Sequence, residues 1–401
     1  MKHLYIFENN DALDLEPISL TRPVFDLRCG PFTMFERIRN LMPGYTITLF
    51  VRDELTFTTM ENYPEFMVNP SSVADGIWLL GNVLWSREDI SMIVKNPGTL
   101  FMDKNGILIA ANVTSGVGNQ WLNEGGPLQN KPPKNVKTLS ISQSVLRYLW
   151  DFIQAIPHAM DVDQQHFPMG SKSENTHWIN SENIYVTDHD LINPGVVIDA
   201  SRGPVIIDKN VEINSFTYLQ GPLYVGEKTT IHSHTQLKQS IIGPQCRIAG
   251  EVTRTIFQGF SNKSHYGYLG DAYIGEWVNL GAGTTNSNLK NNYKPVSVRV
   301  NGKTINTKLL SIGSYIGDHT KTAIGTLLNT GTVIGPGCNI VSHGFPRRNI
   351  PSFMWYIYGK QKKADLNQFF DTATIVKSRR GQKLTEAERT LYKQLLFSNI
   401  D

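Results

Sequence analysis

An aliphatic residue recurs at every sixth position through much of the second half of this 401-residue chain. A period of six suits neither an α-helix nor an alternating strand. It is typical of a triangular coil in which each face contributes one inward aliphatic residue per hexad and each coil covers its neighbour. The repeat therefore predicts a left-handed parallel β-helix rather than an irregular β-sandwich. Its members, with Thr322 in one skipped position, are Ile207, Ile213, Leu219, Val225, Ile231, Leu237, Ile242, Ile248, Ile274, Leu280, Ile316, Leu328, Ile334 and Ile340.

Departures from the period mark further features of the repeat. Glycine often follows the aliphatic residue, as in Val225–Gly226, and we expect small or turn-tolerant residues at the coil corners, where positive φ is useful. The hexads vanish between residues 286 and 310, which predicts a loop projecting from the coil. They are also degenerate between residues 251 and 268, a stretch that contains Lys263 and His265. Projecting segments of this kind often carry function.

The first part of the chain has a different pattern. A helix is expected over 142–155, opening on a serine cap. The alternation of strand-like and helical stretches predicts an α/β domain with a mainly parallel sheet over residues 1–178. The β-helix is expected over 179–355 and a helical tail over 356–401, with a capping box at Thr385 and Glu388. Strands are expected at 4–7, 46–51, 76–80 and 106–110.

Composition narrows the class of protein. Hydrophobic residues make up 40% and charged residues 18%, which is a globular composition. The net charge of +3 does not point to nucleic acid as a partner. Three distant cysteines predict neither a disulfide framework nor a zinc site, and the start of the chain shows neither a signal peptide nor a membrane span. We therefore expect a cytoplasmic protein with no membrane partner.

Two motifs in the repeat region identify a relationship. Residues 265–271 read HYGYLGD and residues 279–284 read NLGAGT, followed by Asn288. Their order and spacing resemble the acetyltransferase motif of bifunctional N-acetylglucosamine-1-phosphate uridylyltransferase/glucosamine-1-phosphate N-acetyltransferases, the GlmU type. The chain looks closest to a divergent branch with an altered nucleotidyltransferase signature. The resemblance runs from residue 20, where the sequence reads LTRPVFDLRCG, to Arg379–Arg380.

The resemblance implies roles for residues of the β-helix. His265 would be the general base that activates the amine of glucosamine 1-phosphate, a task for which a histidine titrating near neutrality is suited. Acetyl-CoA would be the acyl donor, and neighbouring subunits of a homotrimer would share the site. The sugar phosphate would be held by Tyr268, Asn279, Lys294, Asn288 and Arg254, and the coenzyme by Ala282 and Asp318.

The sequence departs from the better-known pattern in the same region. Thr253 stands where a phosphate-binding lysine is expected, with Arg254 beside it as a substitute. Asp318 takes a position that is often serine, and Leu289 replaces an aromatic residue. These changes leave the acceptor sugar and the acyl donor open.

The N-terminal signature is also altered. A nucleotidyltransferase cradles a triphosphate and uses Mg²⁺ to neutralise its charge. The usual glycine-rich loop is absent, and the resemblance makes Arg22, Arg28 and Gly30 the candidates for nucleotide contact. Asn82 falls where the family usually has a metal-binding aspartate. The metal ligands stay unassigned, with Glu8 and Asp103 as alternatives.

Three functions remain open at this point. The leading one is a bifunctional enzyme that acetylates glucosamine 1-phosphate and then uses UTP to make UDP-N-acetylglucosamine for cell-envelope polysaccharides. An alternative is a sugar-1-phosphate nucleotidylyltransferase, for example acting on glucose 1-phosphate with dTTP or UTP, with the β-helix as a trimeric scaffold. A third is a non-catalytic regulatory or assembly protein.

Overall fold

A computed structural model of the chain describes residues 2–129, 131–143, 145–170, 175–188 and 191–398. The chain divides into two compact units. The N-terminal unit comprises Met1–Leu15, Thr21–Leu27 and Phe32–Tyr148. The β-helix unit comprises Glu16–Leu20, Arg28–Pro31 and Leu149–Asp401.

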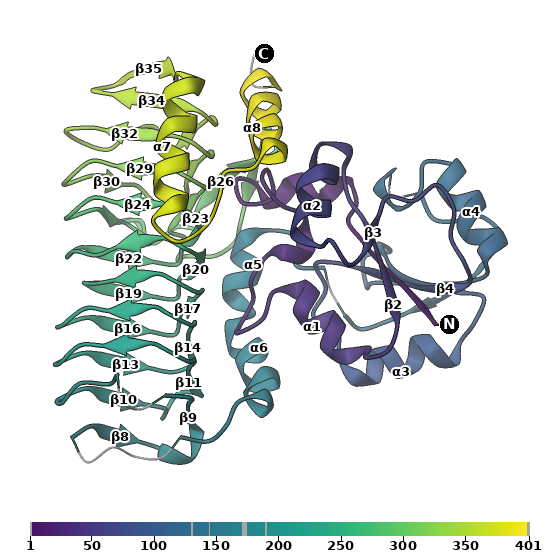
Figure 1. Cartoon of the computed structure of the whole chain (residues 1–401), viewed down its shortest axis with the longest axis horizontal. Helices are drawn as coiled ribbons and strands as arrows, with labels where there is room; N and C mark the ends of the chain where they lie inside the picture. The colour runs from purple at the N-terminus through teal and green to yellow at the C-terminus, as the bar shows by residue number, and fades with distance from the viewer. Residues whose placement is uncertain (1, 130, 144, 171–174, 189–190, 399–401) are drawn as a thin grey trace. The chain divides into compact units, whose positions relative to one another are not determined.

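The described residues of the N-terminal unit form a seven-stranded sheet (Figure 1). Its order is β3 (Met67–Val68), β2 (Thr46–Phe50), β1 (His3–Phe7), β4 (Gly76–Leu80), β6 (Leu108–Val113), β5 (Thr99–Met102) and β7 (Lys137–Ser140). Only β6 runs antiparallel to its neighbours. The predicted strands and the mainly parallel sheet are thus confirmed. The helices of this unit are α1 (Met34–Leu41), α2 (Thr56–Asn62), α3 (Arg87–Lys95) and α4 (Ser115–Asn123).

The helix expected over 142–155 is wrong in its first half. Helix α5 (Leu149–Gln154) begins seven residues later and is followed by α6 (Ile156–Asp163). Before α5 the chain is extended, because Val145 bridges to Val83 and the amide of Leu146 donates to the carbonyl of Asn82 at 2.9 Å. Residue 144 of the expected helix lies outside the described residues. Tertiary hydrogen bonds override the local helical pattern here.

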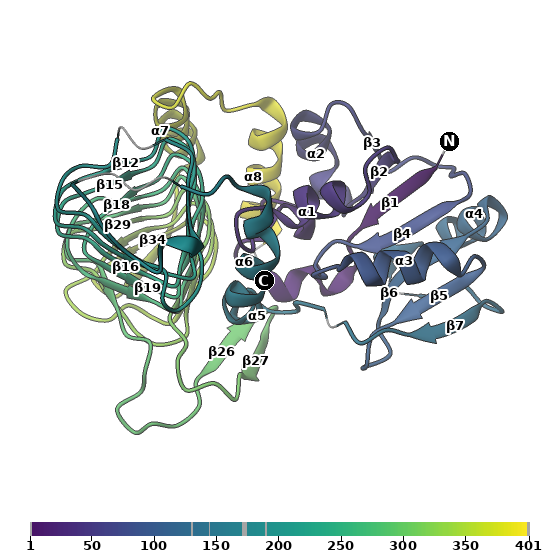
Figure 2. The same cartoon turned by 90° about the horizontal axis from the view of Figure 1, so that it is seen from below.

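The β-helix unit is a stack of coils with three faces, seen from the side in Figure 1 and nearly end-on in Figure 2. Face 1 consists of β8 (His177–Ile179), β10 (Val197–Asp199), β13 (Tyr218–Gln220), β16 (Gln236–Lys238), β19 (Glu251–Thr253) and β22 (Tyr268–Gly270). Face 2 consists of β9 (Ile184–Val186), β11 (Val205–Ile207), β14 (Leu223–Val225), β17 (Ile241–Ile242), β20 (Ile256–Gly259), β23 (Tyr273–Glu276), β28 (Ser314–Ile316), β31 (Thr332–Ile334) and β33 (Asn349–Ile350).

Face 3 is the third sheet of the coil. It consists of β12 (Glu212–Ile213), β15 (Thr230–Ile231), β18 (Arg247–Ile248), β21 (Asn262–Lys263), β24 (Asn279–Leu280), β29 (Lys321–Thr322), β32 (Asn339–Val341), β34 (Met354–Ile357) and β35 (Lys360–Lys363). Strands β25 (Thr285–Asn286) and β30 (Leu327–Leu328) pair separately. All strands of the three faces are parallel except for the terminal β34–β35 hairpin. The predicted left-handed β-helix is therefore the architecture of this unit.

The aliphatic residues of the hexads fill the interior of the coil. Ile207, Ile231 and Leu237, for example, are fully buried in one continuous core. The glycines that follow the aliphatic residues do not have the positive φ we expected. They are required because a Cβ at Gly243 would lie 2.1 Å from the carbonyl oxygen of Gln258 in the next coil. Close stacking of coils, rather than corner curvature, explains these glycines.

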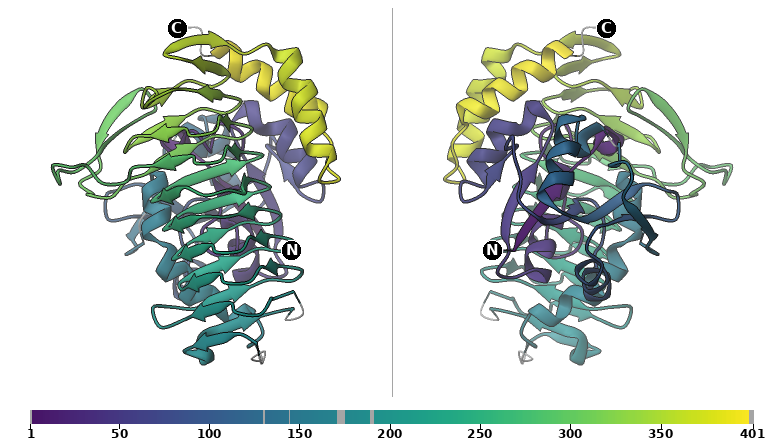
Figure 3. Two further views of the ribbon diagram at one scale, coloured as in Figure 1. Left: turned by 90° about the vertical axis from the view of Figure 1, so that its left-hand side faces the viewer. Right: turned by 90° about the vertical axis from the view of Figure 1, so that its right-hand side faces the viewer.

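Two further segments surround the coils. The predicted projecting loop contains an antiparallel hairpin, β26 (Ser297–Val300) and β27 (Lys303–Asn306), while β23 pairs directly with β28 across the excursion (Figure 2). The tail is helical as predicted, in α7 (Leu366–Ser378) and α8 (Glu386–Ser398), but it continues the coil as β34 and β35 before α7 begins. Figure 3 shows both helices beside the last coils. Residues 399–401 of the expected tail lie outside the described residues.

The capping box predicted for the last helix is present. The Thr385 amide donates to Glu388 Oε2 at 2.9 Å, and the Glu388 amide donates to Thr385 Oγ1 at 3.1 Å. None of the described helices combines the length and the apolar content needed to cross a bilayer. Cys29, Cys246 and Cys338 are all buried.

Candidate functional site

Three of the predicted sugar-phosphate residues form one hydrogen-bonded cluster at the end of face 1. Asn288 Nδ2 donates to the Tyr268 hydroxyl at 3.0 Å and to Asp271 Oδ2 at 2.6 Å. Arg254 Nε donates to Asp271 Oδ1 at 2.8 Å. Asp271, to which we had assigned no role, is the centre of the cluster. We call these four residues the polar cluster.

The polar cluster combines a buried anion with a partly exposed cation. The side chain of Asp271 is 5% exposed and that of Arg254 is 37% exposed. Asp271 therefore orients the guanidinium, whose remaining N–H groups are available to a ligand phosphate. Burial, followed by the charge of Asp271, raises the pKa of Tyr268 to about 12. Its phenol thus stays a neutral hydrogen-bond donor at physiological pH.

His265 lies in the turn that leads from β21 of face 3 to β22 of face 1. Its side chain is exposed, and its imidazole makes no hydrogen bond with any residue that the structure describes. Its backbone is held: Lys263 Nζ donates to the carbonyl of His265 at 3.0 Å and to that of Ala249 at 2.9 Å. A fixed backbone with an unengaged imidazole suits a residue that must accept a proton from a bound amine.

Asn279 is placed elsewhere. It lies on β24 of face 3, in a cavity that it shares with Arg247, Lys321 and Arg380. The polar cluster is on another face, so the structure separates Asn279 from Tyr268 and Asn288, with which we had grouped it. Lys294 is exposed on the excursion between coils and has no side-chain partner within the described ranges.

The two predicted coenzyme residues make contacts within the coil stack. The carbonyl of Ala282 accepts a hydrogen bond from the Gly325 amide at 2.7 Å. Asp318 is 3% exposed, and its Oδ1 accepts from the Glu276 amide at 2.8 Å. Asp318 therefore joins neighbouring coils, and its role as a coenzyme contact stays a prediction.

The predicted nucleotide residues are divided between the two units. Arg22 is buried in the N-terminal unit. Arg28 and Gly30 group with the β-helix unit, where the Arg28 amide donates to the Tyr273 hydroxyl at 2.9 Å. Arg28 Nε donates to the Gln258 carbonyl at 3.3 Å, and its Nη1 donates to the Pro31 carbonyl. Arg28 thus has clear structural partners, and its contact with a nucleotide remains untested.

The residues considered for Mg²⁺ do not form a metal site. Glu8 is fully buried and accepts hydrogen bonds from Arg52 Nε at 2.8 Å and from the amide of Val24 at 3.1 Å. Asp103 accepts from the amide of Asn105 at 2.8 Å and so stabilises its own turn. Within the described residues, no group of three or more histidine, cysteine or acidic side chains could hold a metal ion.

Asn82 has a defined structural role in the N-terminal unit. Its Nδ2 donates to the carbonyl of Leu146 at 3.0 Å and helps to hold the extended segment before α5. Its buried Oδ1 has no hydrogen-bond partner among the described residues. An amide oxygen of this kind can accept one hydrogen bond from a ligand.

Several residues of these sites were missed in the sequence. Asp271 stood inside a recognised motif, and Lys263 stood two positions before His265, yet neither spacing indicates a side-chain contact. Arg379 and Arg380 marked the end of the resemblance without any role. A contact between coils, or between the tail and a coil, leaves no local pattern from which it could be predicted.

Comparison with known proteins agrees with this architecture. Residues 4–172 match the family described as sugar nucleotidyl transferase. A bifunctional sugar-1-phosphate nucleotidylyltransferase/acetyltransferase of Sulfurisphaera tokodaii is 34% identical over 152 residues, 37% of this chain and 38% of that relative. The bifunctional protein GlmU of Wigglesworthia glossinidia brevipalpis is 28% identical over 35% of this chain and 28% of its own length.

An acetyltransferase named YaiX from Escherichia coli is 25% identical over 160 residues, 39% of this chain and 70% of its own length. The matched segments thus span well under two thirds of the two bifunctional relatives. Two of the three relatives have transferase names, and two have names that describe bifunctional proteins. Residues 4–172 of this chain thus match the model of the sugar nucleotidyl transferase family, and the chain continues as a hexapeptide-repeat β-helix.

Proposed function

We propose that the chain is a bifunctional sugar-phosphate transferase that acetylates glucosamine 1-phosphate and transfers a nucleotidyl group from UTP to N-acetylglucosamine 1-phosphate. The observation that carries the acetyl-transfer half is the polar cluster, whose member Tyr268 stands three residues after an exposed, unengaged His265. The proposal includes a division into residues 1–178, 179–355 and 356–401, a homotrimer, and a cytoplasmic location.

In the acetyl-transfer step, the substrate amine attacks the thioester carbonyl of acetyl-CoA. A C–N bond forms, the C–S bond breaks, and the imidazole of His265 takes the amine proton and passes it to the leaving thiolate. Arg254 and Tyr268 would hold the acceptor by its phosphate and hydroxyl groups. The identity of the sugar rests on the resemblance, while the reaction type rests on the base and its neighbouring donors.

The test is thiol release from acetyl-CoA in the presence of glucosamine 1-phosphate. His265→Ala should lower the rate by about a hundredfold or more, the effect expected for a general base. His234→Ala is the matched control, because His234 is another exposed histidine of the coil, stacked on Phe216 at 5.4 Å between ring centroids. Wild-type protein that releases no thiol, or a His265→Ala rate equal to that of His234→Ala, would refute this half of the proposal.

A second function is favoured by the family match of residues 4–172. In it the chain only transfers a nucleotidyl group, with a sugar 1-phosphate oxygen attacking the α-phosphorus and pyrophosphate leaving. Pyrophosphate release with UTP or dTTP, and with glucose 1-phosphate or N-acetylglucosamine 1-phosphate, identifies the substrates. Titration with Mg²⁺ in the same assay tests whether pyrophosphate release depends on the metal.

A further inference from the structure

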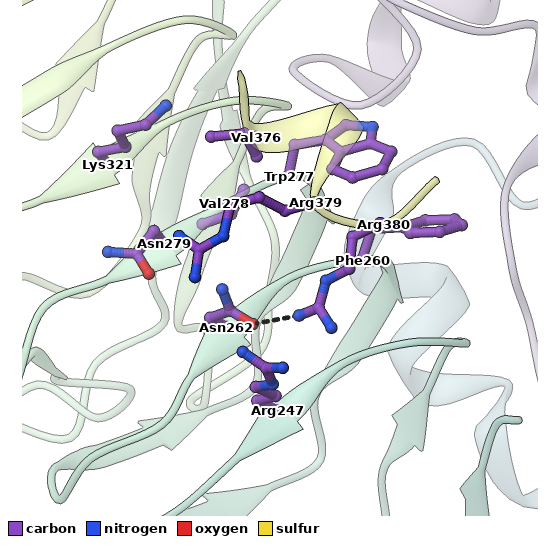
Figure 4. Close-up of a pocket in the computed structure, with 10 residues that line it drawn as sticks. All are labelled: Arg247, Phe260, Asn262, Trp277, Val278, Asn279, Lys321, Val376, Arg379 and Arg380. Carbon is purple, nitrogen blue, oxygen red and sulfur yellow. Dashed lines mark hydrogen bonds between the residues drawn. The ribbon is translucent and has the colours of Figure 1, made fainter. Parts of the chain in front are cut away.

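Face 3 of the β-helix carries a cavity of about 340 Å³ beneath the end of helix α7 (Figure 4). The coil contributes its floor and the tail contributes one wall, so segments more than a hundred residues apart meet here. Its lining residues are Arg247, Phe260, Asn262, Trp277, Val278, Asn279, Lys321, Val376, Arg379 and Arg380. We call it the tail cavity.

The lining of the tail cavity has cations without counter-ions. Four of its residues are arginine or lysine, and none is acidic. Within the described residues, Arg247, Arg379, Arg380 and Lys321 form no ion pair. Where a polar partner is present it is neutral: Arg380 Nη2 donates to Asn262 Oδ1 at 3.1 Å, and Lys321 Nζ donates to a backbone carbonyl at 3.0 Å.

The cations also repel one another. Burial, followed by the nearby charge of Arg247, lowers the pKa of Arg380, and Arg379 adds to this effect. Burial lowers the pKa of Lys321 to about 8. An anion bound in the cavity would remove this repulsion and recover the Coulomb energy that partly buried, unpaired charges lose.

The coil spaces these groups regularly. Arg247 pairs in register with Asn262, Asn262 with Asn279, and Asn279 with Lys321, so four successive rungs present a cation, two amides and a cation in one column. With roughly 4.8 Å between neighbouring strands, the two end cations stand on rungs about 14 Å apart. The tail brings Arg379 and Arg380 to the middle of this column (Figure 4).

We propose that the tail cavity is a binding site for a ligand that carries two or more phosphate groups. A single small anion would neutralise one end of the column and leave the other charged. Several phosphate groups match cations at both ends and in the middle, and the side-chain amides of Asn262 and Asn279 supply neutral donors between them. Free pyrophosphate and the phosphate groups of a nucleotide-type coenzyme both offer this chemistry.

The tail cavity shares Asn279 with the proposed sugar-phosphate site, and its phosphate binding does not require the imidazole of His265. It gives the tail a binding function in addition to packing against the coil. It also accounts for the adjacent pair Arg379–Arg380, which follows directly after α7 and makes no ion pair within the described part of the chain.

Isothermal titration of the full chain with pyrophosphate, with coenzyme A and with inorganic phosphate tests the site at constant ionic strength. The double variant Arg379→Gln/Arg380→Gln should weaken binding of the polyphosphate ligand at least tenfold, and Arg247→Gln should weaken it from the coil side. Lys362→Gln/Lys363→Gln removes the same charge from two exposed lysines of the neighbouring β35 and should leave binding unchanged.

The three ligands distinguish the source of the phosphate groups. Tighter binding of pyrophosphate indicates a free inorganic ligand, and tighter binding of coenzyme A indicates a nucleotide-type one. The proposal is overturned if neither binds more tightly than inorganic phosphate, or if the tail variant and the Lys362/Lys363 control weaken binding equally. A variant that loses the helical signal in circular dichroism is replaced by Arg247→Gln, which leaves the tail sequence intact.

Discussion

Lys263 occupies the inward position of its hexad, where the neighbouring coils of face 3 place Ile248 and Leu280. It is 1% exposed, and its Nζ donates hydrogen bonds to the backbone carbonyls of Ala249 and His265. A buried amine in an aliphatic column costs free energy. The two hydrogen bonds offset part of that cost. They also hold the turn that carries His265, the proposed base.

The pH dependence of stability tests this arrangement. Burial lowers the pKa of Lys263 from 10.5 to about 8. Between these pH values the unfolded chain binds more protons than the folded chain, so the free energy of unfolding should rise with pH across this window. The cost of burying the protonated Lys263 amine is fully present below pH 8. From pH 7.5 to 9.5 the gain should be on the order of 2 kcal/mol for such a lysine.

Urea unfolding at these two pH values measures the effect. Lys263→Met should lose the share that Lys263 contributes, on the order of 2 kcal/mol, while Lys321, whose pKa burial also lowers to about 8, still contributes. Lys362→Met, at an exposed position, should retain the whole gain. A Lys263→Met profile that parallels the wild type would show that Lys263 has an ordinary pKa.

At the level of the strand, the polar residue Thr322 shows how an inward position of the hexad repeat can be filled without an aliphatic side chain. Thr322 stands between Leu280 and Ile340 in the column. Its hydroxyl accepts from the Gly281 amide at 3.0 Å and hydrogen-bonds to Thr284 Oγ1 at 2.7 Å. At the apparent gap in the repeat, a side-chain hydroxyl therefore accepts a hydrogen bond from the backbone of the previous coil.

Restoring the aliphatic pattern should accordingly weaken the fold. Thr322→Val keeps the volume but leaves the Gly281 amide and the buried Thr284 hydroxyl with one partner fewer, at a cost of about 1–3 kcal/mol. Thr322→Ser keeps the hydroxyl and should cost less. Chemical denaturation of both variants measures the difference, and a Val variant more stable than the wild type would contradict this role for the hydroxyl.

Element boundaries were predictable where the pattern of buried residues was long. Four strands of the N-terminal sheet and the aliphatic rungs of the coil were anticipated because each buries a regular set of side chains. The segment before α5 was not, because its backbone hydrogen bonds go to Asn82, 64 residues earlier along the chain. The end of the coil was also missed, since β34 and β35 continue face 3 without the aliphatic hexads.

At the level of the whole molecule, the proposed trimer is the assembly to test. The polar cluster with Tyr268 lies on face 1 and Asn279 lies on face 3, so one chain does not bring together all the residues that the motif groups. A neighbouring chain whose face 3 approached face 1 would bring them together, as a closed threefold ring permits. The separation of the motif residues is thus an argument for assembly.

Sedimentation equilibrium should give a mass about three times that of the 45.1 kDa chain. Mixing an inactive His265→Ala chain with an inactive Asn279→Ala chain should then restore part of the thiol release, because some sites would combine intact residues from both. Monomeric protein with full activity would contradict a shared site. Failure of the mixture to recover activity in a confirmed trimer would place both residues in the same chain's site.

The sequence by itself determined the coil, the parallel sheet and the order of the two units. A repeating pattern of inward side chains can be recognised in a short stretch of sequence, without knowledge of distant contacts. The roles of His265 and of the polar residues near it stay predictions that rest on the resemblance of the motif. Only the tertiary structure decided that Asp271 orients Arg254, that Arg28 is bound by Gln258, and that Arg379 and Arg380 meet Arg247. These contacts depend on which rungs and helices come to lie together, and no local period records that.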